Sequence, residues 1–423
     1  MTSADHADTR SLRVLFITQW FEPEPAFKGA RFARALADTG HQVRIVTGFP
    51  NYPGGKVYPG YRIRWRKREM INGLEVDRLA LWPNHDRSTL GRIANYLSFF
   101  VSLFFYCLQH MRRFDVAYVY HPPLTPGLAA ALVGKVSGTP FVLDVQDLWP
   151  DSVAVSGMAN RHIVRLIDAM CRFVYARAAI IIGQSKGIAN LIAQRGVPRA
   201  KLRHVYNWSN YTPAWPEVQN SGGAPLPPAV AASFEGHFNV VYGGNLGQAQ
   251  ALECLASATI EARRTDPRIR LHLFGDGISR DELAEYAENS NGGVLLHGSV
   301  PREVMDRVFE RADTLALHLK DDPLFRHTIP SKLQHYMSVG RPILAGIEGE
   351  GRTLLEACGA AQIFAPMDVA GARDAMLALV RLGEKEKARM QQSSKTYYSQ
   401  TLSFDAAVAE TLGIIEHAAR RTV

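Results

Sequence analysis

The sequence predicts an α/β protein made of two doubly wound domains, each with a parallel sheet between layers of helices. Its length of 423 residues is more than one ordinary core accommodates and suggests two domains of roughly 200 residues each. Short apolar runs rich in β-branched residues alternate with helical stretches along the chain. A segment crowded with Pro, Gly and Ser, at 212–233, interrupts this alternation near the middle. Two such domains imply a cleft.

Five apolar runs in the first half are expected to form strands, at 13–18, 42–47, 115–120, 140–146 and 178–183. Continuous apolar strands are typical of a parallel sheet that is buried on both faces. In such a sheet the functional site lies at the carboxyl ends of the strands. We therefore place an N-terminal domain at 1–211 and a linker at 212–236.

The alternation restarts after the linker and predicts a second doubly wound domain over 237–403. Its expected strands lie at 238–244, 268–277, 314–319, 342–346 and 361–366. The final stretch, 404–423, has helical spacing of Ala, Val, Leu and Ile and no strand after it. This stretch could pack back on the first domain.

Bulk composition narrows the functional classes without choosing one. The net charge of +8 favours anionic partners, whether nucleic acid, anionic lipid headgroups or phosphorylated substrates. The four cysteines are far apart and form no C-x-x-C pair, which fits a reduced cytosol. The N-terminus shows no signal peptide, so we expect a cytoplasmic protein.

Two common nucleotide-binding classes are excluded by their missing motifs. The chain has no G-x-x-x-x-G-K-[ST], and the strand at 13–18 is not followed by G-x-G-x-x-G, which argues against a P-loop NTPase and a dinucleotide-dependent dehydrogenase. No D-x-D triplet occurs either. We therefore expect no metal ion or other cofactor, and protein cations and helix N-termini must neutralise a bound diphosphate instead.

Two glycine turns follow strands of the second domain and are suited to close approach of a diphosphate. Their candidate residues are Gly243, Gly244, Asn245 and Gly247 in the first turn, and Gly275 and Asp276 in the second. The alternative is that these glycines serve only the geometry of a tight turn. This alternative has more weight for the second glycine turn than for the first, because G-D-G is common in turns.

A loop with Thr328, Ser331 and Lys332 opens a helix whose N-terminus carries partial positive charge. Lys332 is the best candidate phosphate ligand in the chain, and the alternative for it is a solvated helix face. A later loop carries Glu348 and Glu350, which could reach substrate hydroxyls or form a solvated acidic turn.

Two candidate catalytic residues follow strands of the first domain. Asp147 lies after the strand at 140–146, where a general base or a ligand for a substrate hydroxyl belongs, although it could instead be a helix cap or turn former. His121 lies at the end of the strand at 115–120, before two prolines. The prolines indicate a rigid loop and leave open whether His121 reacts.

Together these segments resemble the retaining GT-B glycosyltransferases of family 4, and more closely the bacterial fucosaminyl or fucosyl transferases of O-antigen and exopolysaccharide synthesis. The resemblance spans nearly the whole chain. It is carried by FITQWFEPEP, the run 28–53, DVQDLWPDS, YGGNLGQAQ, LFGDG and TIPSKLQHYMSVGRPILA.

The resemblance implies two facing Rossmann-like domains, acceptor binding by the first and nucleotide-sugar binding by the second. It also implies a C-terminal helix that crosses back to the first domain, and turnover without metal. The expected partners are a nucleotide-diphosphate-sugar, UDP rather than GDP, and a lipid-linked saccharide, with no nucleic acid. The implied acceptor-binding candidates are Lys28, Gly29, Arg31, Asp147 and Trp149.

The chain departs from the family at three places. His327 and His335 stand where relatives hold the donor with two glutamates, Gln248 stands where the first glycine turn usually has a basic residue, and Gln146 followed by Asp147 replaces a common histidine. Two rival functions therefore remain, a catalytically impaired nucleotide-sugar-binding protein and a GT-B-fold epimerase.

For a retaining transfer, the donor phosphate can itself deprotonate the acceptor hydroxyl while the protein stabilises the leaving diphosphate. Preorganised amides from Gly243 to Gly247, the helix beginning near Ser331, and Lys332 suit that task. Double displacement through Asp147 is the alternative.

A membrane contact is suggested by the uncharged, aromatic-rich run 93–108. Sixteen residues at 1.5 Å rise span only ~24 Å, short of the ~30 Å hydrocarbon core, so no transmembrane helix is expected. The run could be a buried helix of the first domain. Alternatively, with the cluster Arg62, Arg64, Arg66, Lys67 and Arg68, it could hold the protein on the anionic inner face of the membrane as a peripheral protein.

Overall fold

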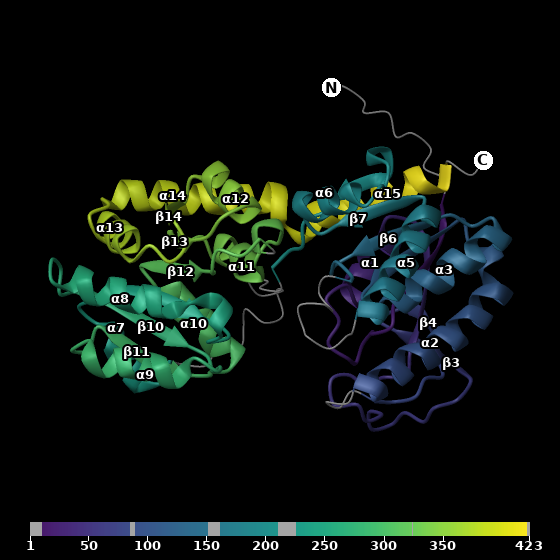
Figure 1. Ribbon diagram of the computed structural model, residues 1–423, viewed down its shortest axis with the longest axis horizontal. Helices are drawn as coiled ribbons and strands as arrows, with labels where there is room; N and C mark the ends of the chain where they lie inside the picture. The colour runs from purple at the N-terminus through teal and green to yellow at the C-terminus, as the bar shows by residue number, and fades with distance from the viewer. Residues whose placement is uncertain (1–10, 85–88, 151–160, 210–225, 324, 421–423) are drawn as a thin grey trace. The chain divides into compact units, whose positions relative to one another are not determined.

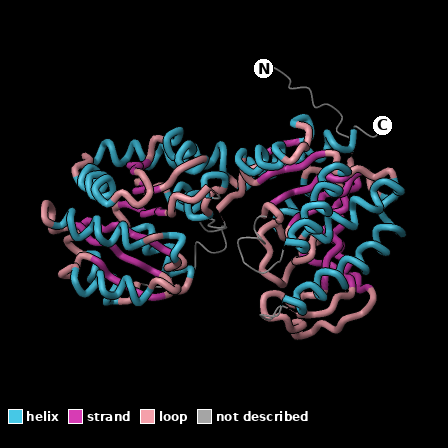
Figure 2. The backbone as a smooth tube through the Cα atoms, in the orientation of Figure 1, coloured by secondary structure: helices cyan, strands magenta, loops and turns pink. Residues whose placement is uncertain are grey.

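The computed structural model describes residues 11–84, 89–150, 161–209, 226–323 and 325–420. The chain divides into two compact units, one of Met1–Val205 with Val408–Val423 and one of Tyr206–Ala407. Within each unit a parallel sheet is flanked by helices, as Figures 1 and 2 show. The predicted fold class, two doubly wound Rossmann-like α/β units, is confirmed.

The first unit contains an eight-stranded sheet in the order β3-β4-β2-β1-β5-β6-β7-β8. Within the described residues, β3 and β4 pair antiparallel and the other neighbouring strands of this sheet pair parallel. The strands are β1 (Arg13–Ile17), β2 (Gln42–Gly48), β3 (Arg66–Ile71), β4 (Leu74–Leu79), β5 (Val116–His121), β6 (Phe141–Val145), β7 (Ile180–Gly183) and β8 (Leu202–His204).

Three strands of this unit, β3, β4 and β8, were not predicted. Four of the six residues of β3 are charged, so the strand lacks the apolar run that marks its buried neighbours. The hairpin does carry a local signal, since Asn72 and Gly73 both adopt positive φ in the turn. Asn-Gly is the turn sequence that favours such a two-residue connection.

The helices of the first unit are α1 (Ala30–Asp38), α2 (Thr89–His110), α3 (Leu124–Ser137), α5 (Arg161–Arg177), α6 (Lys186–Gln194) and the end of α15 (Phe404–Arg420). Glu416 of α15 lies 3.5 Å from the His41 ring, between Oε1 and Nε2. Buried side chains of α2, α3 and α5 form the core on one face of the sheet, with Leu15 and Val119 among the strand residues that they cover.

The second unit contains a six-stranded, all-parallel sheet in the order β11-β10-β9-β12-β13-β14. The strands are β9 (Phe238–Gly243), β10 (Ile269–Phe274), β11 (Val294–Gly298), β12 (Thr314–His318), β13 (Ile343–Gly346) and β14 (Ala361–Phe364). The helices are α7 (Pro228–Phe234), α8 (Leu252–Arg263), α9 (Arg280–Asn289), α10 (Arg302–Arg311), α11 (Ser331–Val339), α12 (Glu350–Cys358), α13 (Val369–Val380) and α14 (Glu384–Tyr397).

The expected linker at 212–236 is only partly within the described residues, because 210–225 lie outside them. The described remainder includes α7, whose Val230 and Phe234 are buried in the core of the second unit. This part of the chain therefore belongs to the second unit rather than to a free linker.

Candidate active site

The chain order of the second sheet reverses between β9 and β12, which lie side by side. Ligands of doubly wound proteins bind at such a switch point, outside the carboxyl ends of the strands. The glycine turn Gly243–Gly247 follows β9, and the loop that leads to α11 follows β12. The sheet thus brings the first glycine turn and Lys332 to one edge.

The two glycine turns interlock too closely for side chains. Gly244 and Gly275 have φ of 138° and 132°, and a Cβ on Gly275 would lie 1.8 Å from the Gly244 carbonyl oxygen. A Cβ on Gly277 would similarly lie 2.4 Å from the Leu246 carbonyl oxygen. These glycines are therefore required by packing whether or not the turns bind a ligand.

The expected row of free amides from Gly243 to Gly247 is wrong for four of its five members. The Gly243 amide donates to the Tyr336 hydroxyl at 3.2 Å, and the Gly244 amide donates to the Phe274 carbonyl at 2.9 Å. The Leu246 amide donates to the Asp276 carbonyl at 2.9 Å, and the Gly247 amide donates to the Gln250 side-chain oxygen at 3.2 Å. The Asn245 amide alone has no acceptor among the described residues.

Lys332 lies in the first turn of α11, directly against the first glycine turn. A Cβ on Gly244 would lie 2.8 Å from Lys332 Nζ, and Nζ is 5.0 Å from the centre of the Tyr242 ring. The side chain is half-buried, and no carboxylate pairs with it in the described part of the chain. Desolvation accordingly lowers its pKa. A desolvated cation without a partner is costly, so a bound anion would stabilise it.

The loops around His327, Glu348 and Glu350 are packed together. Gly349 has φ of 76°, and a Cβ there would lie 2.1 Å from the Arg326 carbonyl oxygen, next to His327. Glu350 accepts a hydrogen bond from the Tyr206 hydroxyl at 2.9 Å. Tyr206 was not among the predicted residues, since 144 residues separate it from Glu350.

The remaining predicted side chains of this unit are largely engaged with their neighbours. Glu348 pairs with Arg352 at 2.8 Å, and the Thr328 hydroxyl donates to a carbonyl in its own loop. Asp276 is exposed and accepts from the amide of the next residue. Ser331 is exposed at the start of α11.

His335 differs chemically from the carboxylate that it replaces. Its Nδ1 lies 3.2 Å from the Ser209 hydroxyl, and its ring packs edge-on against Phe309 at 5.0 Å between ring centres. Desolvation and the nearby Arg302 guanidinium lower its pKa to about 4, so the ring is neutral at pH 7. A neutral imidazole cannot supply the two negative oxygens of a glutamate.

In the first unit, the burial of Lys28 argues against the prediction that it binds acceptor. The Lys28 ammonium is fully buried and pairs with the Asp144 carboxylate, which also accepts from the Tyr118 hydroxyl. Gly29 is equally internal, because its missing Cβ leaves room for the Glu22 carboxylate, which accepts from the Ala30 amide at 2.7 Å.

The other acceptor candidates are more accessible. Arg31 is exposed in the first turn of α1, and Trp149 is half-buried. Asp147 follows β6 and its residue surface is exposed. Partial desolvation of the carboxyl by the surrounding protein raises the pKa of Asp147. Its position still suits a general base. Residues 151–160, which include the end of the DLWPDS motif, lie outside the described residues.

The burial of His121 argues against a reaction with substrate, which the sequence left open. Its side chain is completely enclosed, and its ring lies 6.2 Å from that of Trp149. Neither ring nitrogen has a hydrogen-bond partner in the part of the chain that the structure describes. Burial lowers the pKa to about 4, so the ring is neutral. The His121 ring is therefore enclosed in the protein beside that of Trp149.

Comparison with known proteins agrees with this division of the chain. Residues 30–208 match a glycosyl transferase 4-like domain, and residues 237–381 match the glycosyl transferases group 1 domain. The chain therefore carries a glycosyl transferase 4-like domain followed by a glycosyl transferases group 1 domain. Among its described residues, no group of three or more His, Cys, Asp or Glu side chains is placed to hold a metal ion.

The chain is similar to WcaI of Escherichia coli strain K12, a protein named as a glycosyl transferase of colanic acid biosynthesis. The two are 27% identical over 261 residues, which cover 60% of this chain and 62% of WcaI. The match thus spans less than two thirds of the relative's length.

Two solved structures illustrate the fold. Anabaena Alr3699/HepE in complex with UDP-glucose is 14% identical with a TM-score of 0.62, covering 95% of this chain and 100% of that one. The α,α-trehalose 6-phosphate synthase of Burkholderia multivorans is 12% identical with a TM-score of 0.69, covering 97% of both chains. At these identities the likeness shows the GT-B fold.

Proposed function

We propose that this protein is a metal-independent, retaining glycosyltransferase that moves a sugar from a nucleotide-diphosphate-sugar to a lipid-linked saccharide during synthesis of a cell-surface polysaccharide. It works in the cytoplasm, as a peripheral protein on the inner face of the cell membrane. UDP is the preferred carrier of the sugar.

The observation that carries the proposal is the half-buried Lys332 beside the first glycine turn, which has no carboxylate partner among the described residues. A diphosphate seated there would pair with the ammonium and accept from the Asn245 amide. It would also meet the positive end of α11, whose first-turn amides have no acceptor within the helix. These groups suit negative charge that grows as a diphosphate leaves, without requiring a metal ion.

In the proposed reaction, the bond between the sugar's anomeric carbon and the diphosphate oxygen breaks. The acceptor oxygen bonds to that carbon on the same face, and its proton passes to the departing phosphate oxygen. Lys332 and the Asn245 amide stabilise the leaving group. Double displacement remains the alternative, with Asp147 forming a transient glycosyl ester that the acceptor then displaces.

Relatives support the substrate classes. HepE was solved with UDP-glucose, which favours a UDP-sugar as donor for the same fold. WcaI is named for colanic acid biosynthesis, which favours an acceptor in exopolysaccharide assembly. The identification with O-antigen fucosyl-type enzymes remains a prediction.

A second candidate function, a nucleotide-sugar-binding protein with impaired catalysis, is favoured by His335. Its neutral ring replaces a donor-binding carboxylate and is already held against Ser209 and Phe309. Binding without turnover would be the outcome of that change.

Thermal unfolding in the presence of UDP-, GDP- and ADP-sugars tests the donor assignment. A ligand at ~100 times its dissociation constant stabilises the protein by about 2.7 kcal/mol. The proposal expects the largest shift with a UDP-sugar, and an unchanged midpoint with all three would contradict it. Donor binding without release of UDP, in the presence of lipid-linked saccharides, would favour the impaired binding protein.

A further inference from the structure

Helix α2 exposes a continuous apolar stripe. Its exposed large apolar side chains recur every three or four residues, so they lie on one face of the helix. They are Leu90, Ile93, Leu97, Val101, Phe105 and Leu108. Contiguous exposed apolar surface of this kind marks a site of interaction in a monomeric protein.

The opposite face of α2 is part of the core of the first unit. Phe99, Leu103 and Cys107 are fully buried there. The helix is 22 residues long, which corresponds to ~33 Å, so the expectation that it is too short to span a bilayer is wrong. It is one apolar helix of spanning length, with a third of its most apolar window buried in the protein. Because that face packs on the sheet, only the stripe is available to a partner.

Two exposed tryptophans border the stripe. The Trp65 side chain is 60% exposed, and its ring lies 6.3 Å from the Phe105 ring. Trp82 is 64% exposed beside the start of α2, where its amide donates to the Ser98 hydroxyl and its carbonyl accepts from Asn95. Tryptophan is the residue enriched where an apolar surface meets a membrane–water interface.

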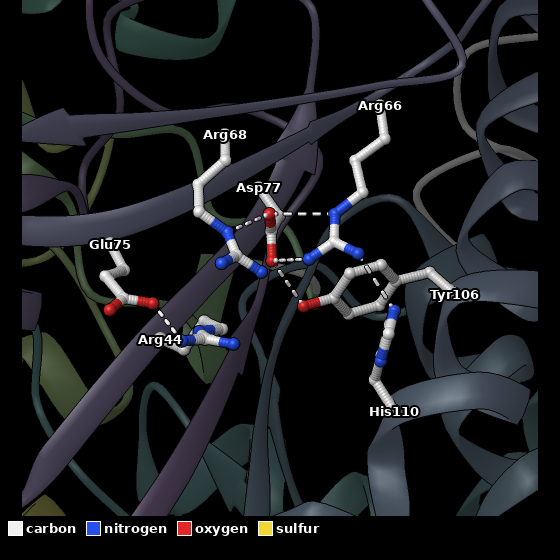
Figure 3. Close-up of polar contacts among 7 residues, drawn as sticks. All are labelled: Arg44, Arg66, Arg68, Glu75, Asp77, Tyr106 and His110. Atoms are coloured by element: carbon white, nitrogen blue, oxygen red, sulfur yellow. Dashed lines mark hydrogen bonds and ion pairs between the residues drawn. The ribbon is translucent and has the colours of Figure 1, made fainter.

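A buried polar cluster fixes strand β3 to α2, as Figure 3 shows. The Asp77 carboxylate accepts from Arg66 at 2.8 Å, from Arg68 at 3.3 Å and from the Tyr106 hydroxyl at 2.7 Å. Arg66 also lies 3.0 Å from Nε2 of His110. Burial alone would raise the pKa of Asp77, but the hydrogen bonds from Arg66 and Tyr106 outweigh it and lower that pKa.

This cluster divides the cations of the 62–68 segment into two groups. Arg66 and Arg68 are committed to Asp77, and Lys67 pairs with Glu69 at 2.6 Å. Arg62 and Arg64 are exposed, and neither has an ion-pair partner among the described residues. The two free cations therefore lie next to Trp65, at the border of the stripe.

We propose that the α2 stripe and the segment 62–65 form a docking surface for an anionic lipid bilayer, with α2 lying in the plane of the interface. The stripe would enter the apolar region while Arg62 and Arg64 meet phosphate headgroups, which is the charge complementarity that selects a membrane over a neutral partner. The inference deepens the proposed function and rests on it for its purpose, because a lipid-linked acceptor is reached from such a surface.

Sedimentation with vesicles of phosphatidylcholine, with and without phosphatidylglycerol, tests the docking surface. The wild-type protein should sediment only with the anionic vesicles, and less at high salt. Each cation near an anionic surface strengthens binding roughly fivefold, so Arg62→Gln/Arg64→Gln should weaken it about 30-fold. Leu97→Gln/Val101→Gln should weaken it at least about tenfold by removing apolar area.

Matched control variants distinguish binding through this surface from a general effect of net charge or of exposed apolar area. Arg264→Gln/Arg311→Gln removes two exposed cations of the second unit, and Ile163→Gln/Leu166→Gln removes two exposed apolar side chains of α5. Both control pairs should bind vesicles as the wild type does. Equal losses in a control pair and its matched test pair would overturn the assignment to α2 and 62–65.

Two further readouts separate the possible failures. Thermal shifts with a UDP-sugar should be the same for all variants, since these positions lie outside the proposed donor site. Vesicle binding that fails while UDP-sugar binding persists overturns only the docking surface, and the reverse result overturns only the donor assignment. If sedimentation velocity shows a dimer that Leu97→Gln/Val101→Gln abolishes, and no vesicle binding occurs, the stripe is an interface between copies of the chain and the proposal is wrong.

Discussion

Replacing Lys332 with methionine removes the charge at the proposed diphosphate site while keeping most of the apolar stem. The ammonium lies against Gly244, is half-buried and has no carboxylate partner among the described residues. A charge-assisted hydrogen bond to phosphate contributes about 1.5–3 kcal/mol. We therefore expect kcat/KM for the UDP-sugar to fall roughly 10- to 150-fold.

The same substitution should leave the folded protein at least as stable. Because desolvation lowers the pKa of Lys332 and no ion pair offsets that cost in the described structure, removing the charge relieves an unfavourable burial. The assay combines steady-state kinetics with thermal unfolding, and Lys385→Met, at an exposed position on α14, is the matched control. Activity within twofold of wild type would refute the assignment of Lys332. A large drop in the unfolding midpoint would instead show a structural role.

Three further predictions follow from buried charges and from the diphosphate site. Lys28→Met should lower the free energy of unfolding by about 3–5 kcal/mol, because it strands the buried carboxylate of Asp144, and adding Asp144→Leu should recover much of that loss; urea unfolding of both variants measures this. Stability should fall as the pH drops from 6.5 towards 4, because His121 and His272, with folded pKa values of about 4 and about 3, take up protons on unfolding. Glu24, whose pKa is raised to about 7, has the opposite effect between pH 7 and 4.5, but it is one group against two histidines. The free energy of unfolding is measured by urea titration at each pH. A value that stays constant or rises as the pH falls would contradict the burial of the histidines. Sugar transfer should continue in EDTA at the wild-type rate, and activity that is lost in EDTA and restored by magnesium or manganese would contradict the metal-independent mechanism.

The sequence predicted the fold where burial dominates the pattern. The runs that became β1, β2, β5 and β9 are apolar and β-branched because both faces of a parallel sheet are covered, so composition alone identifies them. Strand β3 is half-exposed at the sheet edge and charged, so the same pattern could not reveal it.

The two central lysines show why the site was harder to predict than the fold. Lys28 and Lys332 each follow a strand, and neither local sequence shows whether the ammonium has a carboxylate partner elsewhere in the chain. Lys28 pairs with Asp144, which is 116 residues away, whereas Lys332 has no such partner in the described structure. Long-range pairing of this kind depends on the assembled sheet and leaves no signal in either segment.

The hydrogen-bonded amides of the first glycine turn also could not be predicted from the local sequence. Glycines after a strand indicate close approach of another group, and sequence does not say whether that group is a ligand or protein. In this chain the groups that approach are the Gly275 turn and the Tyr336 hydroxyl. Most of the expected amide donors consequently bond to other protein groups. Lys332 is therefore the main group proposed to stabilise the diphosphate.

Transfer of labelled sugar is the most direct test of the central claim. The purified protein would be incubated with radiolabelled UDP-sugars and a bacterial lipid extract, with Lys332→Met in parallel, and the lipid fraction would be counted and its new linkage analysed by NMR. We expect that label enters the lipid fraction as an equal amount of UDP is released and that the linkage keeps the anomeric configuration of the donor. We also expect Lys332→Met to lower the rate at least about tenfold. An inverted linkage, or tight binding of the UDP-sugar without any release of UDP, would contradict the proposed function.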